Sequence, residues 1–200
     1  IGGLTGDDHL GAHISWRFGD AEAGVYATTG NDRNAATGFV AAHVFEQPGT
    51  YSVVATITDT AGIVRVTEAV TITAVAFSGE SRCLSTSGTF DGAPSDCEHR
   101  TATSIDSHLG WLGSGGDRRL LLRRGESFTA SATDVGGSSV RILGAFGSGA
   151  APHVRGSGMM NIGGEHGRVS DLDLDGIGIG MGGSHTVLLR IHAHHCVTNG

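Results

Sequence analysis

The chain has 200 residues, of which 38% are hydrophobic and 16% charged, and this content supports one medium domain or two small ones with a buried core. The 34 glycines lack a three-residue period with proline, which excludes collagen and favours a turn-rich fold over a helical bundle. The net charge of -7, carried with arginine and no lysine, offers no concentrated basic face, so we expect no nucleic-acid partner. No apolar run approaches the roughly 20 residues that cross a bilayer, so we expect no membrane span.

Residues 1–76 carry short alternating runs that are typical of half-buried strands. Residues 51–59 and 64–72 alternate in this way on either side of a turn at 60–62, which predicts a hairpin. Their predicted inward side chains are Tyr51, Val53, Ala55 and Ile57 in the first run and Val64, Val66, Val70 and Ile72 in the second. With the runs at 14–18 and 44–45, four short strands predict a β-sandwich.

Four motifs in this region resemble one known family, the polycystic kidney disease (PKD) repeat. They are Trp16–Asp20 (WRFGD), His43–Phe45, Pro48–Tyr51 and Thr58–Gly62. Two features depart from its usual pattern: Ala21 stands where glycine is common, and a long connection follows it. The resemblance implies an immunoglobulin-like sandwich with a truncated first strand, used as a spacer or as a module that contacts carbohydrate or protein. It does not imply catalysis.

Residues 77–200 contain an internal repeat with an offset of 19 residues, which begins at Ile162 and again at Met181. The repeat aligns Val169 with Leu188, Leu172 with Ile191, Leu174 with Ala193, and Ile177 with Cys196. A unit this short cannot bury its apolar side alone, so neighbouring copies must stack. The alternating apolar residues, with glycines between them, predict the N-terminal coils of a parallel β-helix that is truncated at its C-terminus.

The segments 120–128 (LLLRRGESF) and 168–176 (RVSDLDLDG) resemble coils of right-handed parallel β-helix proteins of the pectate-lyase-like superfamily. That superfamily includes lyases, hydrolases, epimerases and non-catalytic adhesins, so the resemblance implies architecture more than activity. Apolar spacing and a Thr/Ser start predict a short amphipathic helix over 103–112. We expect this helix to cover the open N-terminal end of the solenoid.

The three cysteines predict one bridge and one free thiol. Cys83 and Cys97 flank a loop rich in Ser, Gly, Asp and Pro, which a disulfide could close in an oxidising compartment. Cys196 lies in an apolar alternating stretch, which predicts a small buried side chain.

Three aspartates alternate with two leucines over residues 171–175, so a strand that buries the leucines points all three carboxylates outward. The repeat register then sets three pairs about 4.8 Å apart: Asp171 with Arg190, Asp173 with His192, and Asp175 with His194. Carboxylate and imidazole pairs could perform general acid/base chemistry on a sugar, so the candidate catalytic residues are Asp173, Asp175, His192 and His194. The same face could instead bind Ca²⁺ through the aspartates or a transition metal through the histidines, or serve only as a charge ladder that fixes the strand register.

These features together predict a fragment of a secreted or cell-surface modular protein of bacterial type that binds or processes polysaccharide. Its partner would be a polysaccharide or a cell-surface glycan, and we expect a monomer. An enzyme of this kind would be a lyase, hydrolase or epimerase acting on an acidic glycan, with most of its groove beyond Gly200. The alternative is a non-catalytic adhesin or structural surface protein.

Overall fold

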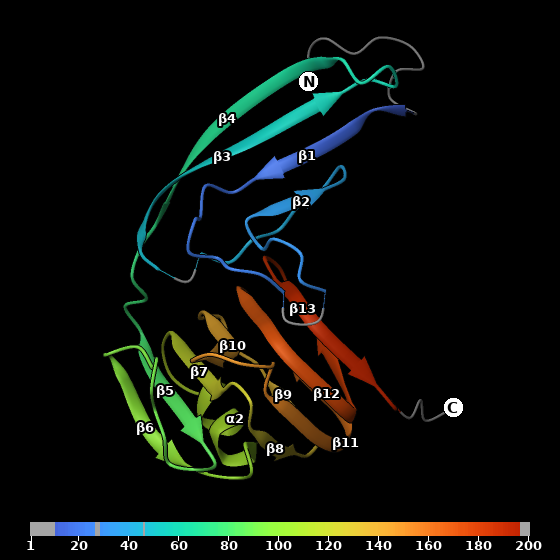
Figure 1. Ribbon diagram of the computed structural model, residues 1–200. Helices are drawn as coiled ribbons and strands as arrows, with labels where there is room; N and C mark the ends of the chain where they lie inside the picture. The colour runs from blue at the N-terminus through green and yellow to red at the C-terminus, as the bar shows by residue number, and fades with distance from the viewer. Residues whose placement is uncertain (1–10, 27–28, 46, 197–200) are drawn as a thin grey trace. The chain divides into compact units, whose positions relative to one another are not determined.

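The chain divides into two compact units, Ile1–Phe77 and Ser78–Gly200 (Figure 1). The computed structural model describes residues 11–26, 29–45 and 47–196. Strands make up 51% of the structure, and the described residues include one short helix. This content confirms the all-β class that the sequence predicts.

The described part of the first unit forms one antiparallel sheet with the strand order β2-β1-β3-β4. Its strands are β1 (His13–Arg17), β2 (Ala35–Thr37), β3 (Gly49–Thr58) and β4 (Val64–Ala74). The predicted hairpin is confirmed, since β3 pairs with β4 along its whole length. Its turn is closed by the Asp59 carboxylate, which accepts hydrogen bonds of 2.9 Å from the backbone N–H groups of Ala61 and Ile63.

The outer strand of this sheet differs from the sequence pattern. Val64, Val70 and Ile72 were predicted to face inward, yet they are 57%, 58% and 38% exposed. The reason is that no second layer covers this strand among the residues that the structure describes. The PKD-like sandwich therefore stays a prediction.

Three of the four motifs that resemble the PKD repeat meet in an aromatic cluster. The rings of Phe18 and His43 stack at 4.5 Å, and those of Phe45 and Tyr51 stack at 4.2 Å. His43 Nε2 lies 2.8 Å from Asp20 Oδ2, and both side chains are almost fully buried. Asp side chains in turns commonly accept from nearby backbone N–H groups, but the Asp20 carboxylate contacts this imidazole instead.

The second unit is a parallel sheet that coils into a β-solenoid of about three turns over residues 118–194. Its first strands are β5 (Glu80–Ser85), β6 (Cys97–Thr101), β7 (Arg118–Arg123), β8 (Ser127–Ala130) and β9 (Thr133–Val135). They are followed by β10 (Arg141–Phe146), β11 (His153–Ile162), β12 (Gly167–Met181) and β13 (Val187–His194). The long strand β12 pairs with β10 through its first part and with β11 through its second part.

Successive turns place corresponding residues directly above one another. Leu120 pairs with Leu143 and Leu143 with Val169, and Val169 pairs with Leu188 of the last strand. Leu172 likewise pairs with Ile191 in parallel register. The stacked parallel arrangement predicted from the 19-residue repeat is therefore confirmed.

Glycines form one corner of the solenoid because successive turns approach too closely there for a side chain. Gly164 has a φ of +88°, and a Cβ atom at this position would lie 1.8 Å from the carbonyl oxygen of Gly137. Gly183 repeats this geometry one turn later against Gly164. Just beyond, the rings of His166 and His185 stack at 4.9 Å, and both residues also have positive φ. The repeated glycines of the sequence are thus a requirement of backbone packing.

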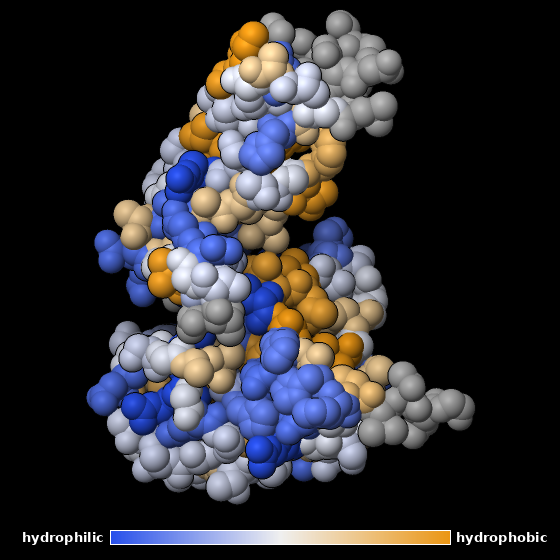
Figure 2. Space-filling view, turned by 45° about the vertical axis from the view of Figure 1, so that its right-hand side comes forward, coloured by the Kyte–Doolittle hydropathy of each residue, from blue (hydrophilic) through white to orange (hydrophobic). Residues whose placement is uncertain are grey.

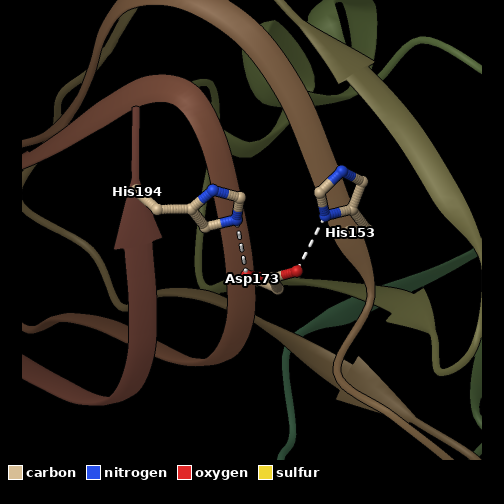
Figure 3. A group of neighbouring side chains, drawn as sticks. All are labelled: His153, Asp173 and His194. Atoms are coloured by element: carbon tan, nitrogen blue, oxygen red, sulfur yellow. Dashed lines mark hydrogen bonds and ion pairs between the residues drawn. The ribbon is translucent and has the colours of Figure 1, made fainter. Parts of the chain in front are cut away.

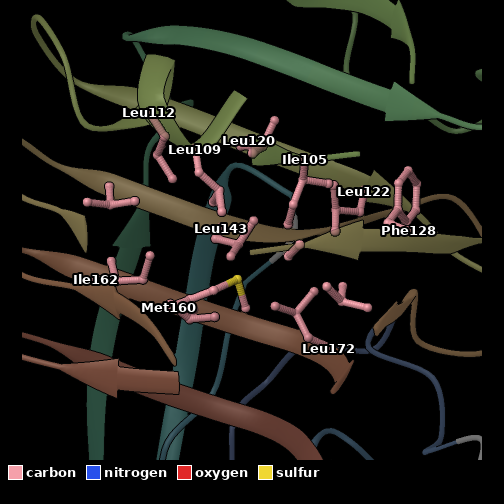
Figure 4. Close-up of a cluster of buried hydrophobic side chains, with 14 of the residues drawn as sticks. Ile105, Leu109, Leu112, Leu120, Leu122, Phe128, Leu143, Met160, Ile162 and Leu172 are labelled. Carbon is pink, nitrogen blue, oxygen red and sulfur yellow. The ribbon is translucent and has the colours of Figure 1, made fainter. Parts of the chain in front are cut away.

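A large apolar core fills the solenoid (Figure 4), and a second, smaller cluster of Cys83, Leu121 and Phe146 lies apart from it. The helix α2 (Asp106–Leu112) contributes to it from beside β7 and β9. Ser104 Oγ, just before the helix, accepts a hydrogen bond of 3.2 Å from the N–H of Asp106. The predicted helix is thus present, although its role as a cap stays a prediction. The core includes Ile105 just before the helix, together with members from the helix and the strands: Leu109, Leu112, Leu120, Leu122, Phe128, Leu143, Met160, Ile162 and Leu172.

The predicted disulfide between Cys83 and Cys97 is present, but the prediction for Cys196 is wrong. Cys83 of β5 and Cys97 of β6 form a disulfide with a Cα–Cα distance of 5.7 Å. Cys196 is a free and exposed thiol, so the prediction that it is buried is wrong. The error arises because β13 ends at His194, so Cys196 lies beyond the pairing that would cover it.

Apolar and hydrophilic side chains form separate patches on the surface of the solenoid unit (Figure 2). The exposed apolar residues include Val187 and Leu188 at the start of β13, which are 40% and 46% exposed. β13 pairs only with β12 in the part of the chain that the structure describes. One side of this strand therefore has no neighbouring strand there.

Candidate functional site

The candidate site is the outward face of three successive strands, β11, β12 and β13. Asp173 and Asp175 alternate along β12 with Leu172 and Leu174, whose side chains are fully buried. The two carboxylates therefore point toward solvent, with 29% and 26% of their side-chain surface exposed. We call the following group the His/Asp face: His153, Asp173, Asp175, His192 and His194.

Asp173 is the centre of this face, because three imidazoles contact its carboxylate. Oδ2 lies 2.7 Å from His153 Nδ1, and Oδ1 lies 2.9 Å from His192 Nδ1. His194 pairs with Asp175 in the backbone register, but its Nε2 atom reaches to 3.2 Å from Asp173 Oδ1. Figure 3 shows the carboxylate between the rings of His153 and His194. The predicted juxtaposition of Asp173 and His192 is thus present.

Asp175 has a looser set of neighbours. Its Oδ1 atom lies 2.9 Å from His195 Nδ1 and 3.6 Å from His194 Nδ1. Its Oδ2 atom lies 3.7 Å from His153 Nε2 and 3.6 Å from Arg155 Nε. Asp175 and His194 are thus paired in the strand register, as predicted. The distance between His194 Nδ1 and Asp175 Oδ1, 3.6 Å, is long for an ion pair.

Three residues that contact the carboxylates of this face are not predicted from the sequence: His153, Arg155 and His195. His153 stands 20 residues before its partner Asp173, so it lies outside the 19-residue alignment. The sequence signal for it is its apolar neighbour Val154, which is fully buried, because strand alternation then places the preceding side chain outward. His195 has a φ of 52°, which breaks the strand alternation and brings its ring to the same side as its neighbour, and no sequence pattern announces this.

Asp171 does not belong to this face, so the prediction of three outward carboxylates is wrong. Its φ of 61° turns the chain at a corner of the solenoid, and the residue is only 8% exposed. The expected partner is nevertheless correct, since Arg190 Nε donates a hydrogen bond of 2.7 Å to Asp171 Oδ1. Arg124 NH2 lies 3.0 Å from the same oxygen. We call Arg124, Asp171 and Arg190 the corner cluster.

The surroundings of the three aspartates favour their charged forms. Burial raises the pKa of Asp173, but its hydrogen bonds with His153 and His192 outweigh this and bring the pKa below its usual value. The hydrogen bond with His195 lowers the pKa of Asp175. Burial also raises the pKa of Asp171, and Arg190 and Arg124 reverse that effect. Ionised carboxylates therefore stand beside imidazole groups across the whole face.

This arrangement can support two kinds of chemistry. An ionised carboxylate beside an imidazole can orient it to accept or donate a proton. Alternatively, imidazole nitrogens and carboxylate oxygens can bind a metal ion, and two groups of three ligand atoms, each within 4.8 Å of one another, are present. One group is His153, Asp173 and His194, and the other is Asp175, His194 and His195.

A second feature, a shallow depression of about 450 Å³ beside β5 and α2, is less suited to binding a sugar. Its single aromatic side chain, Trp111, would be the natural stacking surface for a ring. The guanidinium carbons of Arg82 and Arg118 lie 4.1 and 4.8 Å from the centre of that ring. The indole is thus engaged in cation–π contacts within the fold.

Comparisons of the chain with known protein families, with curated proteins and with solved structures find no match. The fold therefore defines the class: an all-β chain with an antiparallel sheet in one unit and a parallel β-solenoid in the other. The resemblances to the PKD repeat and to the pectate-lyase-like superfamily stay predictions. Among the described residues, no helix has the length and apolar character needed to cross a membrane.

Proposed function

We propose that the chain belongs to a secreted modular protein that handles polysaccharide, and that the His/Asp face of the solenoid contacts the glycan. The observation that carries this proposal is the continuous row of carboxylates and imidazoles across β11, β12 and β13. The row is solvent-facing and presents both hydrogen-bond donors and acceptors, as the hydroxyl groups of a sugar require. The flat parallel sheet beneath it fixes the spacing of these groups.

An acidic glycan suits this face better than a neutral one. Arg155 projects from β11 with 68% of its side chain exposed, and its Nε donates a hydrogen bond of 2.8 Å to His153 Nε2. A guanidinium group in this position can bind the carboxylate of a uronic acid through its two remaining nitrogens. Asp173 and the imidazoles around it would then perform proton transfer in a lyase, hydrolase or epimerase.

The remaining parts of the chain have supporting roles in this proposal. The first unit, by its resemblance to the PKD repeat, serves as a spacer or an additional binding module with an immunoglobulin-like sandwich fold. The helix α2 closes one end of the solenoid core. The disulfide between Cys83 and Cys97 fits an oxidising compartment and so favours the cell surface or the extracellular space.

A second candidate function is a non-catalytic adhesin or structural surface protein. One observation favours it: each carboxylate of the His/Asp face already has imidazole partners, as expected of a ladder that only fixes the strand register. In that case the surface would contact no glycan through these groups.

The two candidates differ in their response to substitutions on the face. Binding of uronic-acid oligosaccharides and of neutral glucans of matched length is measured by calorimetry, with assays for new double bonds and new reducing ends. We expect Asp173→Asn and His192→Ala to weaken binding of the acidic glycan about tenfold, or about 1.4 kcal/mol. His13→Ala, an exposed histidine of the first unit, is the control. Wild-type behaviour of both variants would reject the glycan-handling proposal.

A further inference from the structure

Three potential metal ligands converge from three successive strands. His153 Nδ1 lies 2.7 Å from one carboxylate oxygen of Asp173, and His194 Nε2 lies 3.2 Å from the other. All three ligand groups lie within 4.8 Å of one another. Zn²⁺ held tetrahedrally by bonds of about 2.0–2.1 Å separates its ligand atoms by about 3.4 Å. The group therefore needs only small side-chain rotations to surround an ion.

We propose that His153, Asp173 and His194 form a binding site for a divalent transition-metal ion. Two imidazoles and one carboxylate form a donor set that suits zinc and its neighbours, whereas Ca²⁺ requires six to eight oxygen ligands. This distinguishes the two metal alternatives that the sequence leaves open. The site does not depend on the glycan proposal, because the chain alone supplies its ligands.

Asp175 supplies the outer partners that such a site requires. Metal-binding histidines usually donate their second ring N–H to a carboxylate, which fixes the ring and its tautomer. The second nitrogens of both histidines lie near Asp175, with His194 Nδ1 at 3.6 Å from Oδ1 and His153 Nε2 at 3.7 Å from Oδ2, although His194 Nδ1 is closer to His195 Nδ1, at 2.9 Å. Metal binding through His153 Nδ1 requires its Nε2 atom to carry the proton, so the exposed Arg155 side chain must withdraw from that nitrogen. The exposed His195 ring must likewise turn away from His194 Nδ1, and Asp175 can then accept from both rings.

The surroundings of the ligands fit a site that is held firmly and open on one side. The side chains of His153, Asp173 and His194 are 21%, 29% and 28% exposed, so each is partly enclosed while solvent reaches the group. Parallel pairing fixes the strands, since His153 and His192 both stand opposite Asp173. The alternative group is less suited, because His195 is 78% exposed and lies beyond the end of β13.

The test measures metal binding by the whole chain in the absence of any glycan. Chelator-treated protein is titrated with Zn²⁺ in a calorimeter, and with Co²⁺ to record the paramagnetically shifted NMR spectrum, in which the ring protons of coordinated imidazoles appear. We expect one ion per chain. His153→Ala, His194→Ala and Asp173→Asn should each weaken affinity at least about 100-fold, and Asp175→Asn should weaken it about 10–100-fold.

Two control variants separate this site from other ligands. His13→Ala removes an exposed histidine of the first unit, and Cys196→Ser removes the exposed thiol near β13. Both should bind Zn²⁺ like the wild type. Thermal unfolding of each variant without metal shows whether the variant is folded. If a variant is not folded, the Co²⁺ spectrum of the wild type shows whether imidazoles bind the metal.

The outcomes distinguish the metal site from the proposed function. Absence of stoichiometric binding, wild-type affinity in His153→Ala and His194→Ala, or a Co²⁺ spectrum without imidazole coordination would overturn the metal site. Glycan binding that persists in chelator would leave the glycan proposal standing in that case. Zinc binding without any glycan binding would support the site and reject only the glycan proposal.

Discussion

Two carboxylates on β12, at Asp171 and Asp173, have opposite surroundings. Asp171 lies at a solenoid corner, where its carboxylate is shared by two nearly buried guanidinium groups. Asp173 lies on a flat face, where its partners are imidazoles open to solvent. The difference arises from one backbone angle, the positive φ of Asp171. Corners of this solenoid hold the turns together, and the faces between them leave polar groups available for ligands.

The largest effect should come from the corner cluster. Asp171→Asn removes the negative charge that Arg124 and Arg190 share, and these two arginine side chains are only 14% and 7% exposed. Breaking a buried ion pair on one side costs about 3–5 kcal/mol, so we expect the second unit to lose about that much free energy of unfolding. Urea denaturation measures it. A loss below about 1 kcal/mol would mean that the corner cluster contributes no more to the free energy of unfolding than the His/Asp face does.

The glycine corner should give a slightly smaller effect. Gly164→Ala places a methyl group against the Gly137 carbonyl at a positive φ, and strain of this kind costs about 3 kcal/mol. The matched control is Gly110→Ala in α2, where nothing lies within 4 Å, and this change should stabilise the protein by up to about 1 kcal/mol. Both values come from the same denaturation experiment. Equal effects at the two sites would contradict the close approach of successive turns.

The carboxylate of Glu126, at a third corner, predicts that the stability of the second unit falls in acid. Glu126 follows the turn after β7, and its carboxylate accepts hydrogen bonds from the Ser85 and Ser87 hydroxyls and the Thr86 N–H. Burial raises the pKa of Glu126, but these hydrogen bonds outweigh it and hold the pKa below its usual value. The stabilisation is therefore complete above the unfolded-state pKa of about 4.3 and is lost as pH falls through the folded-state value.

Glu126→Gln tests this expectation. The variant should lose about 1–2 kcal/mol of unfolding free energy at neutral pH. The difference from wild type should shrink as the pH falls below about 4, where the wild-type carboxylate becomes protonated. Denaturation curves recorded over a pH series measure this. A constant difference across the series would show that the charge of Glu126 is not responsible.

The smallest effect on stability should come from the face itself. Asp173→Asn removes a charge whose partners are partly solvated, and such changes alter the free energy of unfolding by about 0.5 kcal/mol or less. The same denaturation experiment compares it directly with Asp171→Asn. A loss as large as that of the corner variant would show that the face is a structural ladder.

The sequence predicts the stacking of the last two turns because the 19-residue repeat carries the register directly. It also identifies the hairpin of β3 and β4, the disulfide and the contact between Asp173 and His192. It does not reveal the corner at Asp171, because a positive φ at a non-glycine residue leaves no periodic signal. The contribution of His153 is hidden for a different reason. Its turn differs in length from the repeat, so only the three-dimensional pairing brings it to Asp173.

Arg141 is a further residue that pattern reading could not place. Its neighbour Ile142 is the apolar residue of the two, yet Ile142 is only partly buried and Arg141 is 1% exposed. Its guanidinium group donates hydrogen bonds to the carbonyl oxygens of Gly115 and Gly116. A buried arginine becomes favourable only when carbonyls from a distant loop surround it, and such partners cannot be read from local alternation.

The constant spacing of 19 residues between β12 and β13 has a consequence for how such a protein changes length. Duplication or loss of one whole turn keeps every inward and outward position in phase, so an added copy presents its polar side chains beside those of the turn before it. Insertion of a single residue within a strand reverses that phase and turns leucines toward water. The molecule can therefore gain or lose surface in discrete steps, with each step copying the existing row of polar groups.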